Sequence, residues 1–338
     1  MKHNILIPDL LTNTSLEKKI LGKNYKITLT NPESFKRLKD KFLENVDGVM
    51  VGHHVNLTKN IIKKLKNCKA IIRYGVGFDS VDVAQASSQQ IKVFNIPDYG
   101  VDEVADHALG LILNISRFLS GNDEVMKNAY RQKKTLWKYD LNKKQTRLKD
   151  LNLGIIGLGR IGTALSQRSK NIFNKISFYD PNIPDGYDKS LNLKKENKLE
   201  DIFKKSDIIS IHAPSSKKNK FFLKDSYFSK IKKSIIFINT SRGDLVKSQT
   251  LSKYFLKGKL SGLGLDVFEN EPVKNNEKLT KLWLENKNVG KIIFTPHVAF
   301  YSEQALHEIR FKGVNTLKNF FEKKNIKNCV NLNLLEKD

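Results

Sequence analysis

The sequence predicts an α/β protein built on doubly wound parallel sheets. Short apolar segments of strand type alternate with helical segments along most of the chain, which is typical of parallel strands joined by helical crossovers. One such strand, residues 153–156, runs into a glycine-rich turn and then a helix, the arrangement that opens a doubly wound sheet. With 338 residues, the chain is long enough for two domains with separate cores.

The N-terminal third carries the first series of alternating elements. A polar helix is expected after the first strand, and further helices are expected near 33–45 and 59–66. The strands of this series are expected at 4–8, 48–51, 70–73 and 92–95. A longer helix over 101–119 has Asp102 and Glu103 near its start and leads out of the first domain.

The glycine-rich turn predicts a nucleotide site. Gly157 allows the tight turn, Gly159 lets the backbone approach a pyrophosphate, and Gly162 lets the new helix pack closely on its strand. Free N–H groups at the helix start attract the anion. A glycine pattern of this kind also occurs in ordinary strand–helix turns, so it needs support from a second feature.

Asp180 supplies that support. A second strand, 176–179, ends at this residue, eighteen positions after Gly162. A carboxylate at this distance accepts hydrogen bonds from the adenosine ribose hydroxyls of a dinucleotide. Because it would repel a 2′-phosphate, the predicted cofactor is NAD rather than NADP.

The second series of elements follows Asp180 and completes the cofactor sheet. Its strands are expected at 208–211, 235–239, 262–267 and 291–294. Between the two series, Trp137 and the polar stretch to Asp150 are expected to form an irregular arm. The last long helix, 302–323, has no strand partner left in this sheet, so it is expected to pack back on the first domain.

Three polar side chains follow successive predicted strands and suit hydride transfer to a carbonyl beside a carboxylate. A guanidinium, Arg242, can bind a carboxylate in a forked geometry and polarise the carbonyl. An imidazole, His297, can exchange the hydroxyl proton near neutral pH. A carboxylate, Glu271, would stabilise the charged imidazole. Each residue taken singly is equally compatible with an ordinary loop position, and the combination favours catalysis.

Composition narrows the classes of partner. The formal net charge is +25, but the basic residues are spread along the chain without interleaved aromatic residues, so we expect solvated lysines and no specific nucleic-acid site. No stretch reaches transmembrane length and no signal peptide is recognisable, which favours the cytoplasm and no membrane partner. Cys68 and Cys329 lack metal or redox spacing, so no metal is expected.

The chain resembles the D-isomer-specific 2-hydroxyacid dehydrogenase family, most closely the branch that contains the C-terminal binding proteins. The resemblance runs from about residue 65 to 317. Its motifs are the stretches RYGVGFD at 73–79, IPDYG at 96–100, DEVADHA at 102–108, the glycine motif at 157–162, NTSRG at 239–243, DVFENEP at 266–272 and TPHVAFYSEQ at 295–304.

The resemblance implies two Rossmann-like domains, with the NAD-binding domain inserted into the substrate domain. The implied NAD domain spans 105–299, and the discontinuous substrate domain spans 1–104 and 300–338. The family usually forms homodimers through its cofactor domains, so a homodimer is expected. The resemblance also implies closure of the cleft between the domains around the hydride.

The same resemblance assigns roles to residues. The implied catalytic residues are Arg242, Glu271 and His297. The implied substrate-binding residues are Arg73, Gly75, Val76, Gly77 and Phe300. The implied cofactor-binding residues are Gly157, Gly159, Arg160, Ile161, Gly162, Asp180, Ala213, Pro214, Thr240, Ser241 and Asp266.

The leading hypothesis is an NAD-dependent dehydrogenase that interconverts a small 2-keto acid and a D-2-hydroxy acid. Phe300 stands where the closest branch typically has tryptophan, so the preferred substrate side chain stays open. Two alternatives also stay open. One is a phosphoglycerate dehydrogenase, which would need extra basic residues for a phosphate. The other is an NAD-sensing binding protein without turnover, similar to a corepressor.

Overall fold

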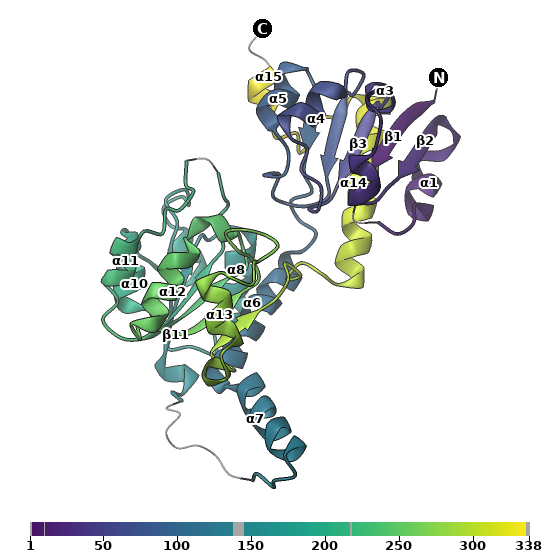
Figure 1. Ribbon diagram of the computed structural model, residues 1–338. Helices are drawn as coiled ribbons and strands as arrows, with labels where there is room; N and C mark the ends of the chain where they lie inside the picture. Colours follow the sequence, from purple (N-terminus) through teal and green to yellow (C-terminus); the bar gives the residue numbers. More distant parts are fainter. Residues whose placement is uncertain (1, 10, 138–144, 217, 336–338) are drawn as a thin grey trace. The chain divides into compact units, whose positions relative to one another are not determined.

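The computed structural model describes residues 2–9, 11–137, 145–216 and 218–335 (Figure 1). The chain divides into two compact units. Unit 1 comprises Met1–Tyr99 and Ser302–Asp338, and unit 2 comprises Gly100–Tyr301. One unit is therefore built from both ends of the chain, and the other is inserted between them.

Unit 1 contains a five-stranded parallel sheet in the order β2-β1-β3-β4-β5. Strands β3 and β4 are buried along their whole length, which explains why both are apolar in the sequence except for Arg73 at the end of β4. The strands are β1 (His3–Ile7), β2 (Tyr25–Leu29), β3 (Gly48–Val51), β4 (Ala70–Arg73) and β5 (Lys92–Phe94). The helices are α1 (Ser15–Leu21), α2 (Pro32–Lys36), α3 (Asp40–Glu44), α4 (Lys59–Lys64), α5 (Val83–Ser88), α14 (Glu303–Lys323) and α15 (Leu332–Leu335), with a 3₁₀ turn η1 (Gly22–Asn24).

The C-terminal helix α14 packs within unit 1, as predicted. Ser302 caps it, its hydroxyl accepting a hydrogen bond from the Ala305 N–H at 2.9 Å. The helix contacts α1 and β4. A Cβ on Gly313 would lie 2.5 Å from the ring of buried Tyr74, so only glycine allows this approach. Helix α14, near the C-terminus, thus packs against the N-terminal part of the chain within unit 1.

The helix expected near 33–45 is a pair of short helices. Asn31 caps α2 by accepting from the Ser34 N–H at 2.8 Å, and α2 ends at Lys36. Lys39 then adopts an extended conformation and α3 begins. Phe35 and Leu43 both reach the same hydrophobic core from the two helices. The single-helix prediction was therefore wrong, because local spacing does not show where packing interrupts a helix.

Unit 2 contains a seven-stranded parallel sheet in the order β12-β11-β10-β9-β6-β7-β8. The strands are β6 (Asn152–Ile156), β7 (Lys175–Tyr179), β8 (Lys194–Lys195), β9 (Ile208–Ile211), β10 (Ile235–Asn239), β11 (Leu260–Leu265) and β12 (Ile292–Phe294). Chain order reverses direction between β6 and β9, which is the place where dinucleotides bind in doubly wound sheets. The predicted fold class is confirmed.

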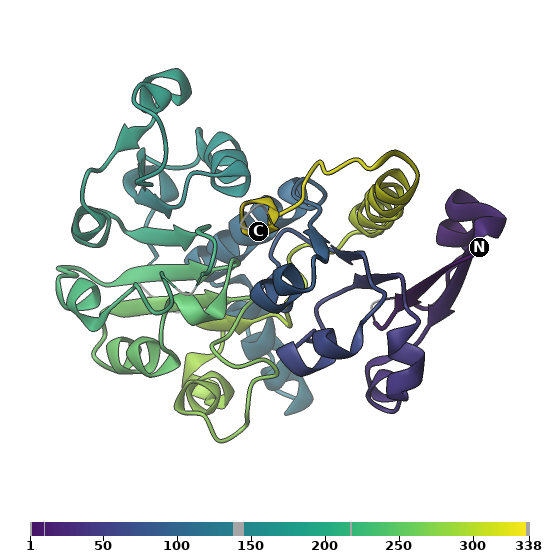
Figure 2. The same cartoon turned by 90° about the horizontal axis from the view of Figure 1, so that it is seen from above.

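Helices cover both faces of this sheet (Figures 1 and 2). Helices α6 and α8 pack in one hydrophobic cluster, and α10 to α13 pack in another. The helices are α6 (Val101–Arg117), α7 (Leu119–Arg131), α8 (Arg160–Ser169), α9 (Tyr187–Leu191), α10 (Leu199–Lys205), α11 (Asp225–Ser229), α12 (Ser248–Leu256) and α13 (Lys278–Leu284). The 3₁₀ turns are η2 (Leu148–Asp150), η3 (Gly243–Leu245) and η4 (Asn286–Asn288).

Three details of unit 2 differ from or lie beyond the sequence predictions. Strand β11 ends at Leu265, so Asp266 follows the strand instead of lying inside it. Helix α7 was not expected. In the predicted irregular arm from Trp137 to Asp150, residues 138–144 lie outside the described residues, and η2 forms its last turn. In the described part of the chain, no helix is long and apolar enough to cross a lipid bilayer.

Candidate active site

Strands β10, β11 and β12 lie side by side and end at the same level of the sheet. Their register pairs Asn239 with Leu265 and Leu265 with Phe294, which are the last residues of the three strands. The loops that follow therefore leave from one carboxyl edge, where ligands bind in open α/β sheets. These loops carry Arg242, Glu271 and His297.

The loop that carries Arg242 is organised by the side chain of Asn239, which is 1% exposed. The Asn239 Oδ1 accepts from the Ser241 N–H at 3.0 Å and from the Ser241 hydroxyl at 2.9 Å. The Asn239 Nδ2 donates to the Arg242 carbonyl at 2.9 Å. A Cβ on Gly243 would lie 1.9 Å from the carbonyl carbon of Phe268, so glycine lets this loop contact the next one.

Glu271 and His297 form a direct pair. His297 Nδ1 lies 2.7 Å from Glu271 Oε2, and Glu271 Oε1 accepts from the Phe268 N–H at 2.9 Å. Burial raises the pKa of Glu271, but the hydrogen bond and charge of His297, the Phe268 N–H and the charge of Arg242 together hold that pKa below its ordinary value. The carboxylate is thus ionised near neutral pH and accepts from a protonated Nδ1.

Asp266 fixes the loop that presents His297. The Asp266 carboxylate is 1% exposed and accepts from the N–H groups of Val298 and Ala299, each at 3.0 Å. The Asp266 carbonyl accepts from the His297 N–H at 2.9 Å. His297 itself has a φ of 53°, in the left-handed region that a non-glycine residue rarely adopts. The backbone N–H groups of His297, Val298 and Ala299 all donate to Asp266, and these hydrogen bonds hold the loop in this conformation.

The glycine turn has the shape that a dinucleotide requires. Gly157 has a φ of 91° and lies against the backbone of Ala213, which follows β9. A Cβ on Gly162 would lie 2.1 Å from the Gly157 carbonyl oxygen. A Cβ on Gly159, in contrast, would meet no atom within 4 Å. The turn is therefore closed toward the protein and open at Gly159, where a pyrophosphate would approach.

The start of helix α8 fits an anion. Its N-cap residue is Gly159, which has no side chain to satisfy the first helical N–H groups, and Arg160 is the first residue of the helix. Asp180 lies beside the turn at the end of β7. Its Oδ2 accepts from the Leu158 N–H and its Oδ1 from the Asn182 N–H, each at 2.9 Å. These residues fit NAD, whose pyrophosphate would be held at α8 and whose ribose would be held at Asp180.

The predicted substrate-binding residues of unit 1 lie at the carboxyl end of strand β4, where Arg73 is the last residue of the strand and Gly75, Val76 and Gly77 follow it. The Arg73 guanidinium donates to the Tyr74 carbonyl, and Gly75 has a φ of 153°. A Cβ on Gly75 would lie 1.4 Å from Arg73 Nη1, so the guanidinium occupies the space that a side chain would fill. Among the described residues, the N–H groups of Val76 and Gly77 donate to no protein acceptor. Two adjacent N–H groups of this kind can bind a carboxylate.

Phe300 lies in unit 2, three residues after His297. Its Cβ lies against the backbone of Gly100, where an added Cβ would be 3.5 Å away. The side chain is half-buried.

Sequence reasoning missed the residues that hold the site in place. Asn239 is one, and Thr295 is another, since its hydroxyl donates to Asp266 Oδ1 at 2.6 Å. Asn239 ends one predicted strand and Thr295 follows another. A small polar residue at the end of a buried strand was the sequence signal that could have indicated both. The partner that each one bonds could not be read from spacing alone.

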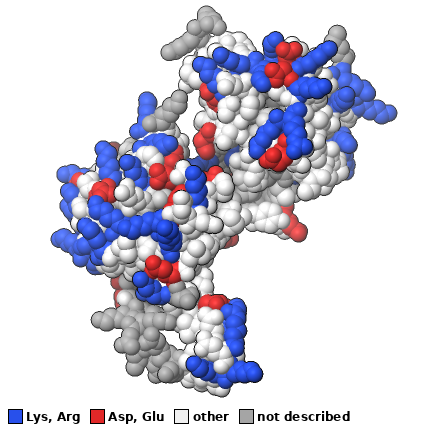
Figure 3. Space-filling model, in the orientation of Figure 1, with Lys and Arg blue, Asp and Glu red and all other residues white. Residues whose placement is uncertain are grey.

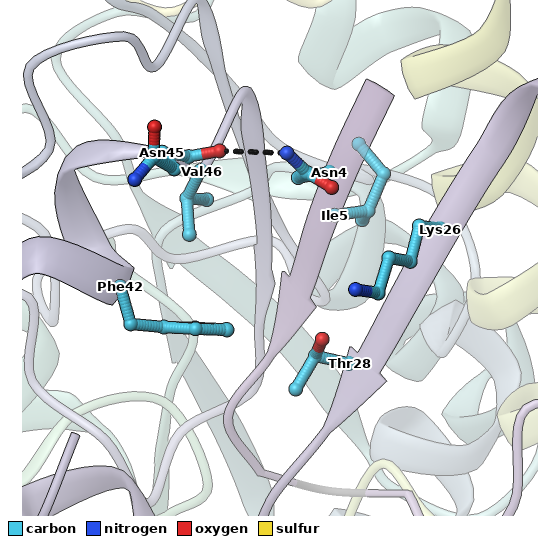
Figure 4. Close-up of a pocket in the computed structure, with 7 residues that line it drawn as sticks. All are labelled: Asn4, Ile5, Lys26, Thr28, Phe42, Asn45 and Val46. Carbon is cyan, nitrogen blue, oxygen red and sulfur yellow. Dashed lines mark hydrogen bonds between the residues drawn. The ribbon is translucent and has the colours of Figure 1, made fainter. Parts of the chain in front are cut away.

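A hollow of about 160 Å³ in unit 1 is separate from these residues (Figure 4). It lies against β1, β2 and α3, near the amino ends of the strands. Its lining residues are Asn4, Ile5, Lys26, Thr28, Phe42, Asn45 and Val46. Ligands of parallel sheets bind at the opposite, carboxyl edge, so we assign no function to this hollow.

Comparison with known proteins identifies the family. Residues 109–299 match the model of the D-isomer specific 2-hydroxyacid dehydrogenase NAD-binding domain. A hydroxypyruvate reductase from Thermotoga maritima is 31% identical over 283 residues, which cover 83% of this chain and 86% of the relative. A probable 2-ketogluconate reductase from Dictyostelium discoideum is 30% identical over 334 residues, 96% of this chain and 94% of the relative.

Solved structures agree with this result. The crystal structure of a D-lactate dehydrogenase from Aquifex aeolicus, complexed with NAD and lactic acid, superposes with a TM-score of 0.82 and 26% identity. The match covers 95% of this chain and 96% of that one. Placement in the branch of the C-terminal binding proteins stays a prediction. The chain belongs to the D-isomer-specific 2-hydroxyacid dehydrogenase family, and it is an NAD-dependent oxidoreductase of that family.

Proposed function

We propose that this enzyme interconverts a 2-keto acid and a D-2-hydroxy acid, with Arg242 binding and polarising the substrate and His297 and Glu271 acting as an acid–base pair. The observation that carries the proposal is the 2.7 Å contact between His297 Nδ1 and Glu271 Oε2 at the carboxyl edge of the sheet. A carboxylate that orients an imidazole is the usual arrangement for general acid–base work.

The residues divide the reaction between them. NADH, when bound, supplies the hydride that C2 of the keto acid receives. Protonated His297 donates its Nε2 proton to the carbonyl oxygen, so that hydride and proton together give the hydroxy acid. Glu271, bonded to Nδ1, stabilises the charged imidazole. Arg242 attracts electron density toward the carbonyl oxygen and so favours hydride attack at C2.

We propose that unit 1 binds the substrate carboxylate. Arg73 and the N–H groups of Val76 and Gly77 supply positive charge and donors, and Gly75 makes room for the guanidinium. Phe300 is the residue that we expect to influence the preferred substrate side chain. We propose a substrate domain of 1–104 and 300–338 and an NAD-binding domain of 105–299, with bounds that differ by a few residues from those of units 1 and 2.

The proposed cofactor contacts come from five strand ends. The glycine turn and α8 take the pyrophosphate, and Asp180 takes the adenosine ribose. Ala213 and Pro214 come after β9, one residue beyond its end, and the backbone of Ala213 lies beside Gly157. The remaining proposed contacts are Thr240, Ser241 and Arg242 after β10, and Asp266 after β11, at the carboxamide.

We also propose a homodimer in the cytoplasm. Helix α7 projects from the rest of unit 2 (Figure 1) and exposes Leu119, Met126 and Tyr130. These residues are seven and eleven positions apart, which places them on one helix face. An exposed apolar stripe of this kind is typical of a contact surface.

The proposal is tested by replacing the imidazole. His297→Ala should lower kcat by about 10²- to 10⁴-fold, the usual contribution of a general acid, while the Kd for NADH changes little. Turnover is measured with NADH and a panel of keto acids, and NADH binding by fluorescence titration. If NADH binding collapsed and turnover per bound complex survived, the assigned role of His297 would be wrong.

The choice of keto acids discriminates between substrates. The relatives named above suggest hydroxypyruvate, 2-ketogluconate and pyruvate as first candidates. A keto acid with a terminal phosphate tests the phosphoglycerate dehydrogenase alternative. NADH binding without turnover on any keto acid would favour the alternative of an NAD-sensing binding protein.

A further inference from the structure

A hydrogen-bond chain connects helix α6 to the loop of His297. His107, on α6, places Nε2 at 3.0 Å from the Thr295 hydroxyl oxygen. The Thr295 hydroxyl donates its only proton to Asp266 Oδ1 at 2.6 Å. The oxygen of Thr295 must therefore accept from His107, and His107 carries its proton on Nε2 in this bond.

The chain ends on the backbone around His297. Asp266 accepts from the N–H groups of Val298 and Ala299 through its carboxylate and from the His297 N–H through its carbonyl. The left-handed conformation of His297 is unfavourable by itself and persists because these bonds impose it. A group that orients the Thr295 hydroxyl toward Asp266 therefore helps to orient the imidazole ring of His297.

His107 is a polar residue next to the apolar residues with which α6 packs on the sheet. The buried face of α6 is otherwise apolar, with Ala108, Leu111 and Ile112 in the hydrophobic cluster. The His107 side chain keeps 23% of its surface exposed and lies 3.8 Å from Asp266 Oδ1. The imidazole is explained by the hydrogen bond that it donates.

We propose that His107 is a positioning residue for catalysis, acting through Thr295 and Asp266 on the loop that presents His297. This inference rests on the proposed role of His297 as the general acid. His107 does not exchange the substrate proton itself. Its imidazole fixes the hydroxyl of Thr295, which in turn fixes the carboxylate that anchors the turn.

The first test compares two substitutions at position 107. His107→Leu removes the donor, while His107→Gln keeps an N–H group at a similar distance from the helix. His107→Leu should lower kcat about fivefold, the effect of one hydrogen bond, with the Kd for NADH and the Tm close to the wild-type values. His107→Gln should restore most of kcat. Asp106→Asn is the matched control, because Asp106 is exposed on the same helix and bonds Arg168 instead.

The second test asks whether His107 acts through Thr295. Thr295→Val removes the hydroxyl at nearly constant volume. The two single variants, His107→Leu and Thr295→Val, should each lower kcat, and the double variant should be no slower than the slower single variant, because both remove the same chain of bonds. Independent effects that multiply in the double variant would overturn the proposal.

The remaining outcomes separate this inference from the proposed function. Wild-type kcat in His107→Leu, with His297→Ala inactive, would overturn the positioning role alone. High turnover in His297→Ala would overturn the proposed function itself. If His107→Leu and His107→Gln lowered kcat to the same extent, and both also lowered the Tm, His107 would have a role in folding only. This result would also overturn the positioning role.

Discussion

At the scale of single residues, the buried polar side chains determine how the loops of the site are shaped. Asn239 and Asp266 are each 1% exposed, and a buried amide or carboxylate is costly unless its polar atoms are hydrogen-bonded. The Asn239 side chain forms its hydrogen bonds with the backbone of the turn that follows it. The Asp266 carboxylate accepts its hydrogen bonds from the backbone of the turn after β12. Each loop can therefore adopt few other conformations.

Asp180 provides a test of cofactor choice. Its carboxylate lies at the end of β7 beside the glycine turn, where it would repel a 2′-phosphate. Asp180→Ala should therefore reduce the ratio of kcat/KM for NADH to that for NADPH by about tenfold or more, roughly the value of a lost charge-assisted hydrogen bond plus a removed repulsion. The ratio is measured with one keto acid at fixed ionic strength. A wild-type enzyme that preferred NADPH would contradict the assignment.

His212 provides a test of stability against pH. This residue follows β9, and burial lowers the pKa of its imidazole from 6.5 to about 3. Between these values the unfolded chain binds a proton that the folded chain does not, so the free energy of unfolding falls as pH drops below about 6.5. At pH 5 the loss from this group should be about 2 kcal/mol.

The measurement is urea unfolding of wild type and His212→Gln at pH 7 and pH 5. The variant should lose less stability between the two pH values than the wild type does. His307→Gln, at an exposed position on α14, is the control and should keep the wild-type pH dependence. Identical pH dependence in all three proteins would show that His212 is not buried in its neutral form.

At the scale of secondary-structure elements, helix length decided how well the sequence predicted the structure. Helix α14 was expected over 302–323 and is observed as Glu303–Lys323, because many turns repeat the same apolar spacing. Helices α2 and α3 have five residues each and leave too little periodicity to define their ends. Strand β2, which was not predicted, lies at the edge of its sheet with only Tyr25 buried.

The attachment of α14 to α1 depends on a buried ion pair. Arg310 donates from Nε and Nη2 to the two carboxylate oxygens of Glu17, both at 2.8 Å, and Glu17 is 0% exposed. Arg310→Met would leave this carboxylate buried without its partner, so the free energy of unfolding should fall by about 3–5 kcal/mol. Urea unfolding measures the change.

A double variant separates the ion pair from packing. Glu17→Gln combined with Arg310→Met removes both charges, so it should be more stable than Arg310→Met alone. If the double variant were as unstable as the single one, lost packing of the arginine stem would explain the effect instead of an unpaired charge.

At the scale of the whole molecule, charge and apolar surface have different distributions. On the face shown in Figure 3, Lys and Arg side chains lie on both units among Asp, Glu and uncharged residues, as expected from a net charge of +25 spread along the sequence. The exposed apolar face of α7 is local by comparison. It is formed by Leu119, Met126 and Tyr130.

The proposed homodimer gives a prediction at this scale. Met126→Glu with Tyr130→Glu places two charges in the stripe and should convert a dimer into a monomer, as measured by light scattering after size-exclusion chromatography. Asn128→Glu, on the opposite helix face, should leave the dimer intact. A monomeric wild-type protein would contradict the proposal, and so would a double variant that stays dimeric.

The sequence by itself determined the fold class, the place of most strands, the glycine turn and the family. These features depend on spacing within a few residues, and apolar periodicity or a required glycine is a local property of the chain. The same local motifs named Arg242, Glu271 and His297, whose strands the register then brought to one level.

Only the tertiary structure decided which side chains hold one another. Glu17 and Arg310 are 293 residues apart, and His107 and Thr295 are 188 residues apart. A hydrogen bond between such residues depends on donor and acceptor being within about 3 Å in a fixed direction, and that geometry arises when whole strands and helices pack. The chemistry of the site could thus be read from motifs, whereas the bonds that orient it come from the fold.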